Sequence, residues 1–237
     1  LGGGIAGVTT AYYLAKEGHE VTLIEEQDGV GRDASAGNAG IIAPGHSFAW
    51  ASPKAPGMLL RSLLGHETAI RVRPRLDPAL VVWGLRFLRE CSEERARHNT
   101  VVKLRLCQYS QTVMADLVSA EGIEYHAVHR GALYLFRDPR ELEAGVRKMA
   151  LLAEHGQRQE ILDPDQIARL DPAFEPVRHK IAGAVRDVGD SSGDSRLFTE
   201  NLARICRDKL GVTLRLGVRV TGLRAEGDRV VGAVTSA

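Results

Sequence analysis

The feature that most constrains this chain is a glycine-rich turn at its start, in the residues LGGGIAGVTTAYYLAKEGHEVTLIEE. Gly2, Gly4 and Gly7 have the spacing G-x-G-x-x-G. In such a turn the first glycine permits the tight bend, the second lets the backbone approach a pyrophosphate, and the third lets a helix pack close to a sheet. We expect a helix from Ile5 to about Lys16, whose first N–H groups and positive dipole end attract that diphosphate.

The residues after the turn complete the pattern. Ala11 and Leu14 recur at helical spacing and are expected on the sheet-facing side, and Gly18 is expected at the C′ position that ends the helix. A short apolar strand follows over residues 21–24, with Glu25 at its carboxyl end. A carboxylate there accepts hydrogen bonds from a ribose diol, which argues against a 2′-phosphorylated nicotinamide cofactor. The pattern does not distinguish FAD from NAD, and a glycine-rich turn that binds no cofactor is a third interpretation.

Composition limits what else the chain can do. Its 237 residues suffice for one large or two modest domains, and the 44% that are hydrophobic support a real core. Lys and Arg number 31 against 30 Asp and Glu, so a net charge of +1 gives no reason to expect a nucleic-acid partner. The longest apolar run, around residues 79–88, contains Arg86 and is too short to span a bilayer.

The cysteines and histidines do not form a ligand pattern. Cys91, Cys107 and Cys206 are odd in number, far apart and without a CxxC pair, so we expect neither a disulfide framework nor a zinc site. This usage fits a reducing compartment, the cytoplasm. His126 and His129 are three residues apart, but they fall in a region of predicted strands, where the two side chains diverge. We therefore predict no metal site.

Residues 27–52 form a glycine-rich stretch of small residues without helical or strand periodicity. The stretch is too long for an ordinary surface turn, which favours a function. Asp33, Ser35 and Asn38 can hydrogen-bond locally, and the small residues let backbone N–H groups come close to a ligand. The segment AGNAGIIAPG is also less charged than a flexible loop, so we expect this stretch to contact a cofactor.

The middle of the chain is predicted to be irregular and then helical. Residues 53–77 carry an arginine patch that could meet a lipid head group or an anionic substrate, although a solvated face is the preferred interpretation. The patch consists of Arg61, Arg71, Arg73 and Arg75. Two helices are expected next, over residues 78–97 and about 101–120. Trp83 is expected in the core rather than as a stacking platform. Tyr109 could be a site residue, but a buried tyrosine with a satisfied hydroxyl is the preferred interpretation.

Later segments alternate between strands and helices. Asp194 or Ser195 is expected to cap a helix that ends at Gly211. The other expected elements are strands around 125–128 and within 123–137, a helix over 139–155, a turn–helix–turn in LDPDQIARLDP at 162–172, and strands at 181–185, 212–216, 218–223 and 229–235.

The αβ pattern of the opening thus returns near the end, with different material between. We predict the α/β class, with a nucleotide-binding domain made from residues 1–52 and 187–237 and a second domain, residues 53–186, inserted between them. The chain opens on Leu1, directly before the glycines, and stops at Ala237 after an apolar strand. We therefore expect a fragment truncated at both ends.

At this point the residues resemble the FAD-dependent D-amino-acid oxidase-like superfamily, and within it the small subunit of bacterial D-amino-acid dehydrogenases. Five stretches carry the resemblance: the opening LGGGIAGVTTAYYLAKEGHEVTLIEE, then ASAGNAGIIAPGHSFAWASPKAPG, the segment around Trp83, Cys91 and Asn99, QYSQ with GIEYHAVHRGALYLFRD, and GDSSGDSRLFTENLA. The first is shared by many flavoproteins, whereas the second and the last are more specific. The family is considerably longer than this chain.

The resemblance implies a fold and a set of contacts with FAD. The fold would be a Rossmann-like FAD-binding domain of the GR2 type with an inserted α+β substrate domain, in which the strand GALYLF belongs to a sheet that faces the flavin. His46 follows the stretch expected at the flavin, so a role in the site stays open, although a structural or pocket-lining role is preferred. The implied cofactor-binding residues are Gly2, Gly3, Gly4, Ile5, Ala6 and Gly7 at the pyrophosphate, Glu25 with Glu26 nearby at the ribose, Ser35, Asn38, Ala39, Gly40 and Ile41 along the pyrophosphate, ribityl chain and flavin, and Val220 against the adenine.

The resemblance also implies an activity, the oxidation of a D-amino acid to a 2-oxo acid and ammonia, with electrons passing to a quinone or another acceptor. A glycine-, sarcosine- or proline-type oxidase or dehydrogenase of the same superfamily stays open, as does a non-catalytic nucleotide-binding subunit. No catalytic residue is named, because the arginine expected to bind the substrate carboxylate would lie outside this chain. Homo- or hetero-oligomers, and peripheral contact with the inner face of the cell membrane, are left open.

Overall fold

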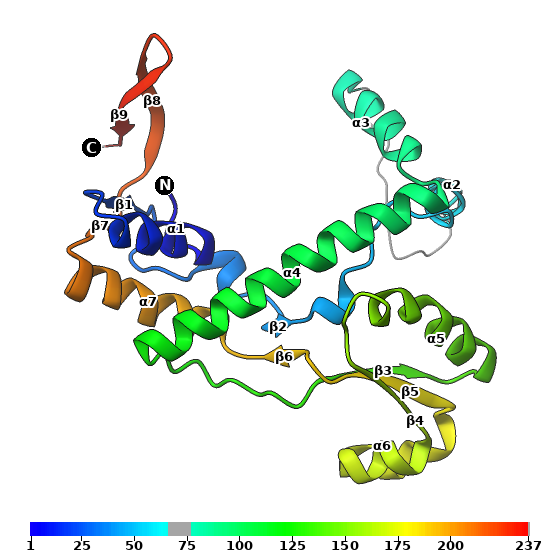
Figure 1. Cartoon of the computed structure of the whole chain (residues 1–237). Helices are drawn as coiled ribbons and strands as arrows, with labels where there is room; N and C mark the ends of the chain where they lie inside the picture. The colour runs from blue at the N-terminus through cyan, green and yellow to red at the C-terminus, as the bar shows by residue number, and fades with distance from the viewer. Residues whose placement is uncertain (66–76, 237) are drawn as a thin grey trace. The chain divides into compact units, whose positions relative to one another are not determined.

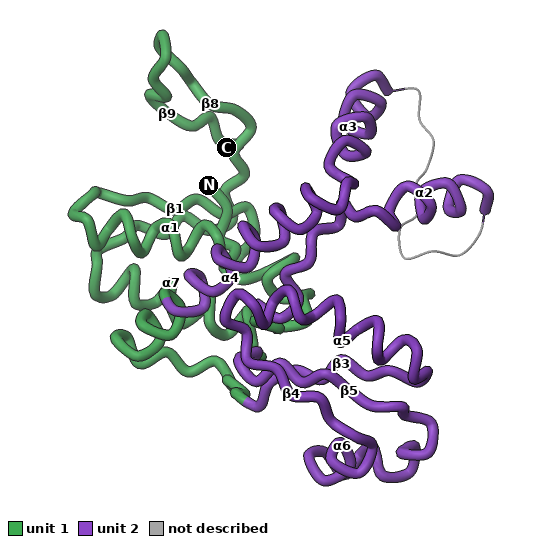
Figure 2. Tube along the Cα trace, turned by 45° about the vertical axis from the view of Figure 1, so that its right-hand side comes forward, with its two compact units in different colours: residues 1–42, 113–129, 191–237 green, residues 43–112, 130–190 purple. Residues whose placement is uncertain are grey.

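We analysed a computed structural model that describes residues 1–65 and 77–236. Figure 1 shows the order of its helices and strands, and Figure 2 colours its two compact units. Unit 1 consists of Leu1–Ile42, Val113–His129 and Ser191–Ala237, and unit 2 of Ala43–Thr112 and Arg130–Asp190. These boundaries differ from the predicted domain segments, since residues 43–52 fall in unit 2 and residues 113–129 in unit 1. The assignment of domains with separate roles stays a prediction.

Unit 1 is built around two helices and a short parallel pair of strands. Helix α1 (Ile5–Lys16) packs on α7 (Ser195–Leu210), and β1 (Thr22–Ile24) pairs with β7 (Thr213–Arg215). The prediction for α1 is confirmed at both ends, with Gly18 at a φ of 88° after its last turn. Of the two residues expected on one face, Ala11 is buried and Leu14 is 40% exposed, because the buried stripe of α1 runs through Val8, Ala11 and Tyr12.

Helix α7 shows why its sequence begins and ends a helix where it does. The Asp194 side chain accepts a hydrogen bond from the Leu197 backbone N–H at 2.8 Å, so Asp194 rather than Ser195 is the N-cap. Gly211 follows the last turn with a φ of 70°, as the sequence predicted. The helix buries Phe198, Thr199, Leu202, Ala203 and Cys206, and it supplies much of the core of unit 1.

Two small antiparallel pairs complete unit 1. Strand β2 (Ile41–Ile42) pairs with β6 (Ser191–Ser192), and β8 (Val220–Glu226) forms a hairpin with β9 (Arg229–Thr235). The predicted strand around residues 125–128 is wrong, because only Val128 forms an isolated bridge, to Ser192.

Unit 2 contains a three-stranded antiparallel sheet in the order β3-β5-β4. Its strands are β3 (Ala132–Phe136), β4 (Gln159–Leu162) and β5 (Gly183–Asp187). Helix α5 (Pro139–Ala153) packs on β3 and β5, and α6 (Pro164–Leu170) on β4 and β5. The 3₁₀ helix η3 (Pro172–Lys180) packs against α6.

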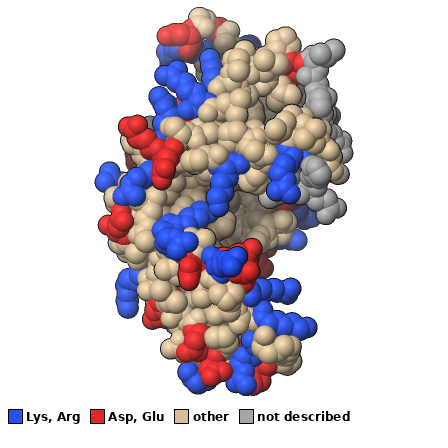
Figure 3. Space-filling view, turned by 90° about the vertical axis from the view of Figure 1, so that its right-hand side faces the viewer, with Lys and Arg blue, Asp and Glu red and all other residues tan. Residues whose placement is uncertain are grey.

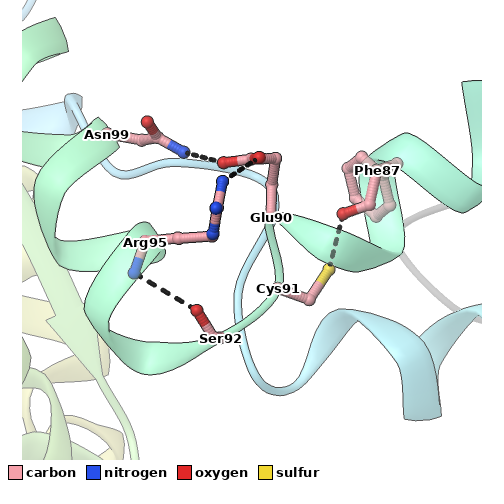
Figure 4. Close-up of polar contacts among 6 residues, drawn as sticks. All are labelled: Phe87, Glu90, Cys91, Ser92, Arg95 and Asn99. Carbon is pink, nitrogen blue, oxygen red and sulfur yellow. Dashed lines mark hydrogen bonds and ion pairs between the residues drawn. The ribbon is translucent and has the colours of Figure 1, made fainter.

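The long helix α4 (Glu93–Glu121) contributes its first part to unit 2 and its last part to unit 1. The sequence placed its start near residue 101 and ran the preceding helix to residue 97, whereas α3 (Pro78–Arg89) ends earlier. Figure 4 shows why the chain turns at residues 90–92. The Ser92 hydroxyl accepts from the Arg95 N–H at 3.3 Å and starts α4, while the Glu90 carboxylate binds the side chains of Arg95 and Asn99. The hydrogen bond from Asn99, with the charge of Arg95, lowers the pKa of Glu90.

Three other expectations for the middle of the chain are wrong. Residues 53–77 are not wholly irregular, since α2 (Ala55–Leu63) lies within them and carries Arg61. Trp83 is 58% exposed and Tyr109 is 68% exposed, so neither is a core residue among the parts of the chain that the structure describes. Helical periodicity locates an apolar face but does not show what covers it. Arg71, Arg73 and Arg75 lie outside the described residues.

Candidate functional site: the glycine turn at the start of helix α1

The glycine turn folds back on the end of β1. The Gly2 N–H donates to the Ile24 carbonyl at 2.9 Å, and Gly2 has a φ of 88°, in the region that favours glycine. A Cβ added at Gly7 would overlap the Gly2 carbonyl oxygen, so the first turn of α1 tolerates only glycine there. These two glycines therefore keep the surface at the helix start free of side chains.

The N-terminus of α1 presents backbone donors, and its own first turn carries no acidic side chain. Gly4 is the N-cap residue and offers no side-chain cap. The Ile5 N–H instead donates to the Ser35 hydroxyl at 3.0 Å. The first N–H groups of a helix have no partner within it, and the dipole makes this end positive. The arrangement suits an anionic group such as a diphosphate.

Glu25 lies over the same turn. Its carboxylate accepts a hydrogen bond from the Gly3 N–H and another, at 2.8 Å, from the Gln27 N–H. The side chain is half-buried, and a Cβ at Gly3 would lie 3.1 Å from Glu25 atoms. Glu26 points elsewhere and forms an exposed ion pair with Arg219 at 2.9 Å. The acid at the strand end is therefore held beside the glycine turn, as the sequence pattern predicted.

Residues 38–41 continue from Ser35 towards β2. The Asn38 amide donates to the Ser35 carbonyl at 3.1 Å, and its oxygen accepts from the Gly40 N–H at 2.7 Å. Gly40 has a φ of 62°, and a Cβ there would overlap the Gly193 carbonyl. Ala39 and Ile41 are exposed. The local structure of this segment is thus fixed by its own amide and by glycine, which leaves its apolar side chains outward.

Val220, the first residue of β8, is only indirectly linked to the turn. Two residues before it, the Val218 N–H donates to the Glu25 carbonyl at 2.9 Å. The structure therefore brings Glu25, Ser35 and the 2–7 turn together at one end of α1, continues the chain into residues 38–41, and joins Val220 through the backbone of Glu25. The binding of a cofactor by these residues stays a prediction.

Sequence reasoning missed one residue of this arrangement. Gly31 is buried, has a φ of 69°, and donates its N–H to the Gly3 carbonyl at 2.9 Å. A Cβ at Gly31 would lie 3.3 Å from the Thr199 Cβ on α7. The only signal in the sequence was the glycine itself, in the segment DGVGR.

Among the described residues, no three His, Cys, Asp or Glu side chains lie close enough together to bind a metal ion. None of the described helices is long and apolar enough to cross a membrane. On the face shown in Figure 3, basic and acidic side chains are interspersed.

Together the observations fit a cofactor that carries a diphosphate. A surface that only glycine can form lies at the start of a helix whose first turn has no acidic residue, and a carboxylate capable of binding a ribose diol lies at the end of the next strand. In an α/β unit, this combination defines a dinucleotide-binding protein. Comparison with known families identifies the group: residues 1–237 match the DAO family of FAD dependent oxidoreductases, and the chain belongs to this family.

Relatives and solved structures agree with the assignment. The chain is 45% identical over 237 residues to D-amino acid dehydrogenase 2 of Mesorhizobium japonicum, covering 100% of this chain and 57% of the relative. It is 42% identical over 232 residues to the D-amino acid dehydrogenase of Xanthobacter autotrophicus, covering 98% and 55%. The chain thus spans little more than half the length of these curated relatives.

The fold is similar to that of glycine oxidase from Bacillus cereus ATCC 14579, with a TM-score of 0.67 and 19% identity over 99% of this chain and 50% of that one. It is also similar to L-proline dehydrogenase from P. horikoshii, with a TM-score of 0.59 and 20% identity over 99% and 47%. These likenesses confirm the predicted fold class.

Proposed function

We propose that the protein containing this chain is a FAD-dependent D-amino-acid dehydrogenase, which oxidises a D-amino acid to a 2-oxo acid and ammonia. The observation that carries the proposal is that curated D-amino acid dehydrogenases match this chain at 36–45% identity over at least 98% of its length. The glycine turn with Glu25 supports the cofactor half of the proposal independently.

FAD would be held chiefly by backbone groups of this chain. The pyrophosphate would lie on the 2–7 turn at the start of α1, and the adenosine ribose would meet the Glu25 carboxylate, with Glu26 nearby. Ser35, which already binds the Ile5 N–H, would lie beside the pyrophosphate. The ribityl chain and flavin would follow residues 38–41, of which Asn38, Ala39 and Ile41 are exposed, and the adenine would meet Val220.

When bound, the flavin supplies the redox chemistry by accepting a hydride at N5. The amino acid would thereby be oxidised to an imine, which water would hydrolyse to the 2-oxo acid and ammonia. The protein has to orient the Cα–H bond, hold the carboxylate and favour the neutral amine. If the amine arrives deprotonated, no protein acid or base is required, and we assign no catalytic residue. We further propose that the electrons pass to a quinone or a similar acceptor, with the protein on the cytoplasmic side, peripheral to the membrane.

A panel of substrates and acceptors tests the proposal on the full-length holoprotein. D-Alanine should reduce an artificial dye and release pyruvate and ammonia in equal amounts, without steady production of hydrogen peroxide. Peroxide in proportion to substrate would show an oxidase instead. Activity with glycine, sarcosine or proline but not D-alanine would identify another amine oxidoreductase, and activity with none of these amines would favour a non-catalytic nucleotide-binding subunit.

A further inference from the structure

Two buried carboxylates in unit 2 have no part in the proposed cofactor site. Asp187 is 0% exposed and Asp190 is 1% exposed. Asp190 accepts hydrogen bonds from the Gly45 N–H and from the Tyr134 hydroxyl, both at 2.9 Å. Asp187 accepts two from the Gln157 amide, at 3.1 and 3.2 Å. Burying a carboxylate costs free energy unless hydrogen bonds compensate, so Asp187 and Asp190 require these donors in these positions.

The carboxylates fix the turn at residues 44–46, the 3₁₀ helix η2 (Pro44–His46). Gly45 is buried, and a Cβ there would lie 2.7 Å from atoms of both Asp187 and Asp190. Any side chain at residue 45 would therefore collide with the buried pair. The backbone of the turn lies directly against the two carboxylates, and the Gly45 N–H donates a hydrogen bond to Asp190.

The next residue, His46, is exposed and lies parallel to Tyr134. The two rings have centroids 5.9 Å apart and an interplanar angle of 1°. Tyr134 is thus fixed twice, by its hydroxyl on Asp190 and by its face towards the imidazole. Asp190 therefore binds two groups next to the imidazole. One is the N–H of Gly45, the residue before His46, and the other is the hydroxyl of Tyr134, whose ring lies beside the imidazole.

We propose that Asp190 and Tyr134 are positioning residues that hold the His46 imidazole as a contact for the amino-acid substrate. The inference rests on the proposed function and deepens it. His46 follows Ile41, the last residue proposed to lie along the flavin, by five positions. An imidazole N–H can donate to a substrate carboxylate, whereas Tyr134 and Asp190 are engaged with each other and act through His46.

The test uses substitutions that keep the shape of the stack and remove one polar group each. His46→Phe keeps an aromatic ring beside Tyr134 and removes the N–H donors. Tyr134→Phe keeps the ring and removes the hydroxyl that binds Asp190. Tyr109→Phe, at an exposed tyrosine of the same unit, is the matched control. Each full-length holoprotein is titrated anaerobically with D-alanine, and the substrate dissociation constant, the limiting rate of flavin reduction, the flavin content and the melting temperature are recorded.

His46→Phe should raise the substrate dissociation constant about tenfold or more, the change expected from losing a hydrogen bond to a charged group, with flavin content unchanged. Tyr134→Phe should raise it less. In the double variant, Tyr134→Phe should add nothing, because its effect passes through His46.

Three results would overturn the inference. The dissociation constant could be unchanged in His46→Phe while the wild type is still reduced, which would sink the inference and leave the proposed function standing. The Tyr134→Phe effect could persist in full in the double variant, or appear only as a lower melting temperature, and either would show a merely structural role. A wild-type flavin that no D-amino acid reduces would remove the proposed function and this inference together.

Discussion

At the scale of single residues, the glycine turn depends on the absence of a side chain at Gly7. The Gly2 carbonyl oxygen occupies the place where a Cβ at residue 7 would lie, so Gly7→Ala must displace the turn from the start of α1. We expect the affinity for FAD to fall by about tenfold or more, equivalent to at least about 1.4 kcal/mol. The measurement is the ratio of flavin to protein after gel filtration at a series of FAD concentrations.

The control for this prediction is Gly222→Ala on β8, because a Cβ at Gly222 would meet no atom within 4 Å. This variant should keep its flavin. Equal retention of flavin by the Gly7→Ala and Gly222→Ala proteins would contradict the assignment of the turn.

Glu25 gives a second prediction at this scale. Glu25→Ala removes the carboxylate proposed to bind the ribose and should weaken FAD binding by about 1–3 kcal/mol, through the loss of charge-assisted hydrogen bonds. Glu26→Ala removes an exposed ion pair with Arg219 near the proposed ribose site and should weaken FAD binding less than Glu25→Ala does. Fluorescence titration of the apoprotein with FAD compares the two variants, and indistinguishable dissociation constants would remove the ribose assignment.

At the scale of secondary-structure elements, the sequence predicted the helices that carry their own start and stop signals. A turn–helix–turn was predicted at 162–172, and α6 lies there with a capping box formed by Asp163 and Gln166. Asp194 and Gly211 bound α7 as expected. The failures occurred where a side-chain contact outside the periodic pattern decides the boundary. The break before α4 depends on Glu90 and on the hydroxyl of Ser92, which the apolar spacing does not show.

The cap of α7 offers a prediction for this scale. Asp194→Ala leaves the Leu197 N–H without its acceptor and should lower the free energy of unfolding by about 1 kcal/mol. Asp208→Ala, at an exposed aspartate near the other end of the same helix, is the control and should have a smaller effect. Urea unfolding followed by circular dichroism measures both, and an Asp194→Ala midpoint equal to that of wild type would refute the cap's contribution.

At the scale of the whole molecule, local patterns identified the glycine turn and the acid that follows it, because these residues are close in sequence. The cluster around Asp190 was not predicted, since its partners Tyr134 and Gly45 are 56 and 145 residues away in sequence. Sequence spacing carries no signal for contacts of that kind. The fold class, in contrast, follows from the order of helices and strands and was confirmed by the family match.

Asp190 also predicts how stability depends on pH. Burial, with the nearby charge of Asp187, raises the pKa of Asp190 from 3.8 to about 6, although hydrogen bonds from Gly45 and Tyr134 oppose the shift. The native state therefore binds a proton more tightly than the unfolded state, so the contribution of Asp190 to stability falls as pH rises from about 4 to 6. The fall should be on the order of 2–3 kcal/mol.

The measurement for this prediction is the difference in unfolding free energy between wild type and Asp190→Asn, which cannot ionise at residue 190. Relative to this variant, wild type should be most stable near pH 4 and should lose that advantage by about pH 6.5. A difference that does not change with pH would contradict the assignment of the titration to Asp190.

We propose that a flavin bound at the glycine turn takes electrons from a D-amino acid. The most direct test is to add D-alanine, without oxygen, to the purified full-length protein and follow the visible absorbance of its flavin. The yellow colour should bleach with D-alanine and persist with L-alanine. Colour that persists with D-alanine and every other D-amino acid, in a protein whose flavin dithionite still reduces, would contradict the proposal.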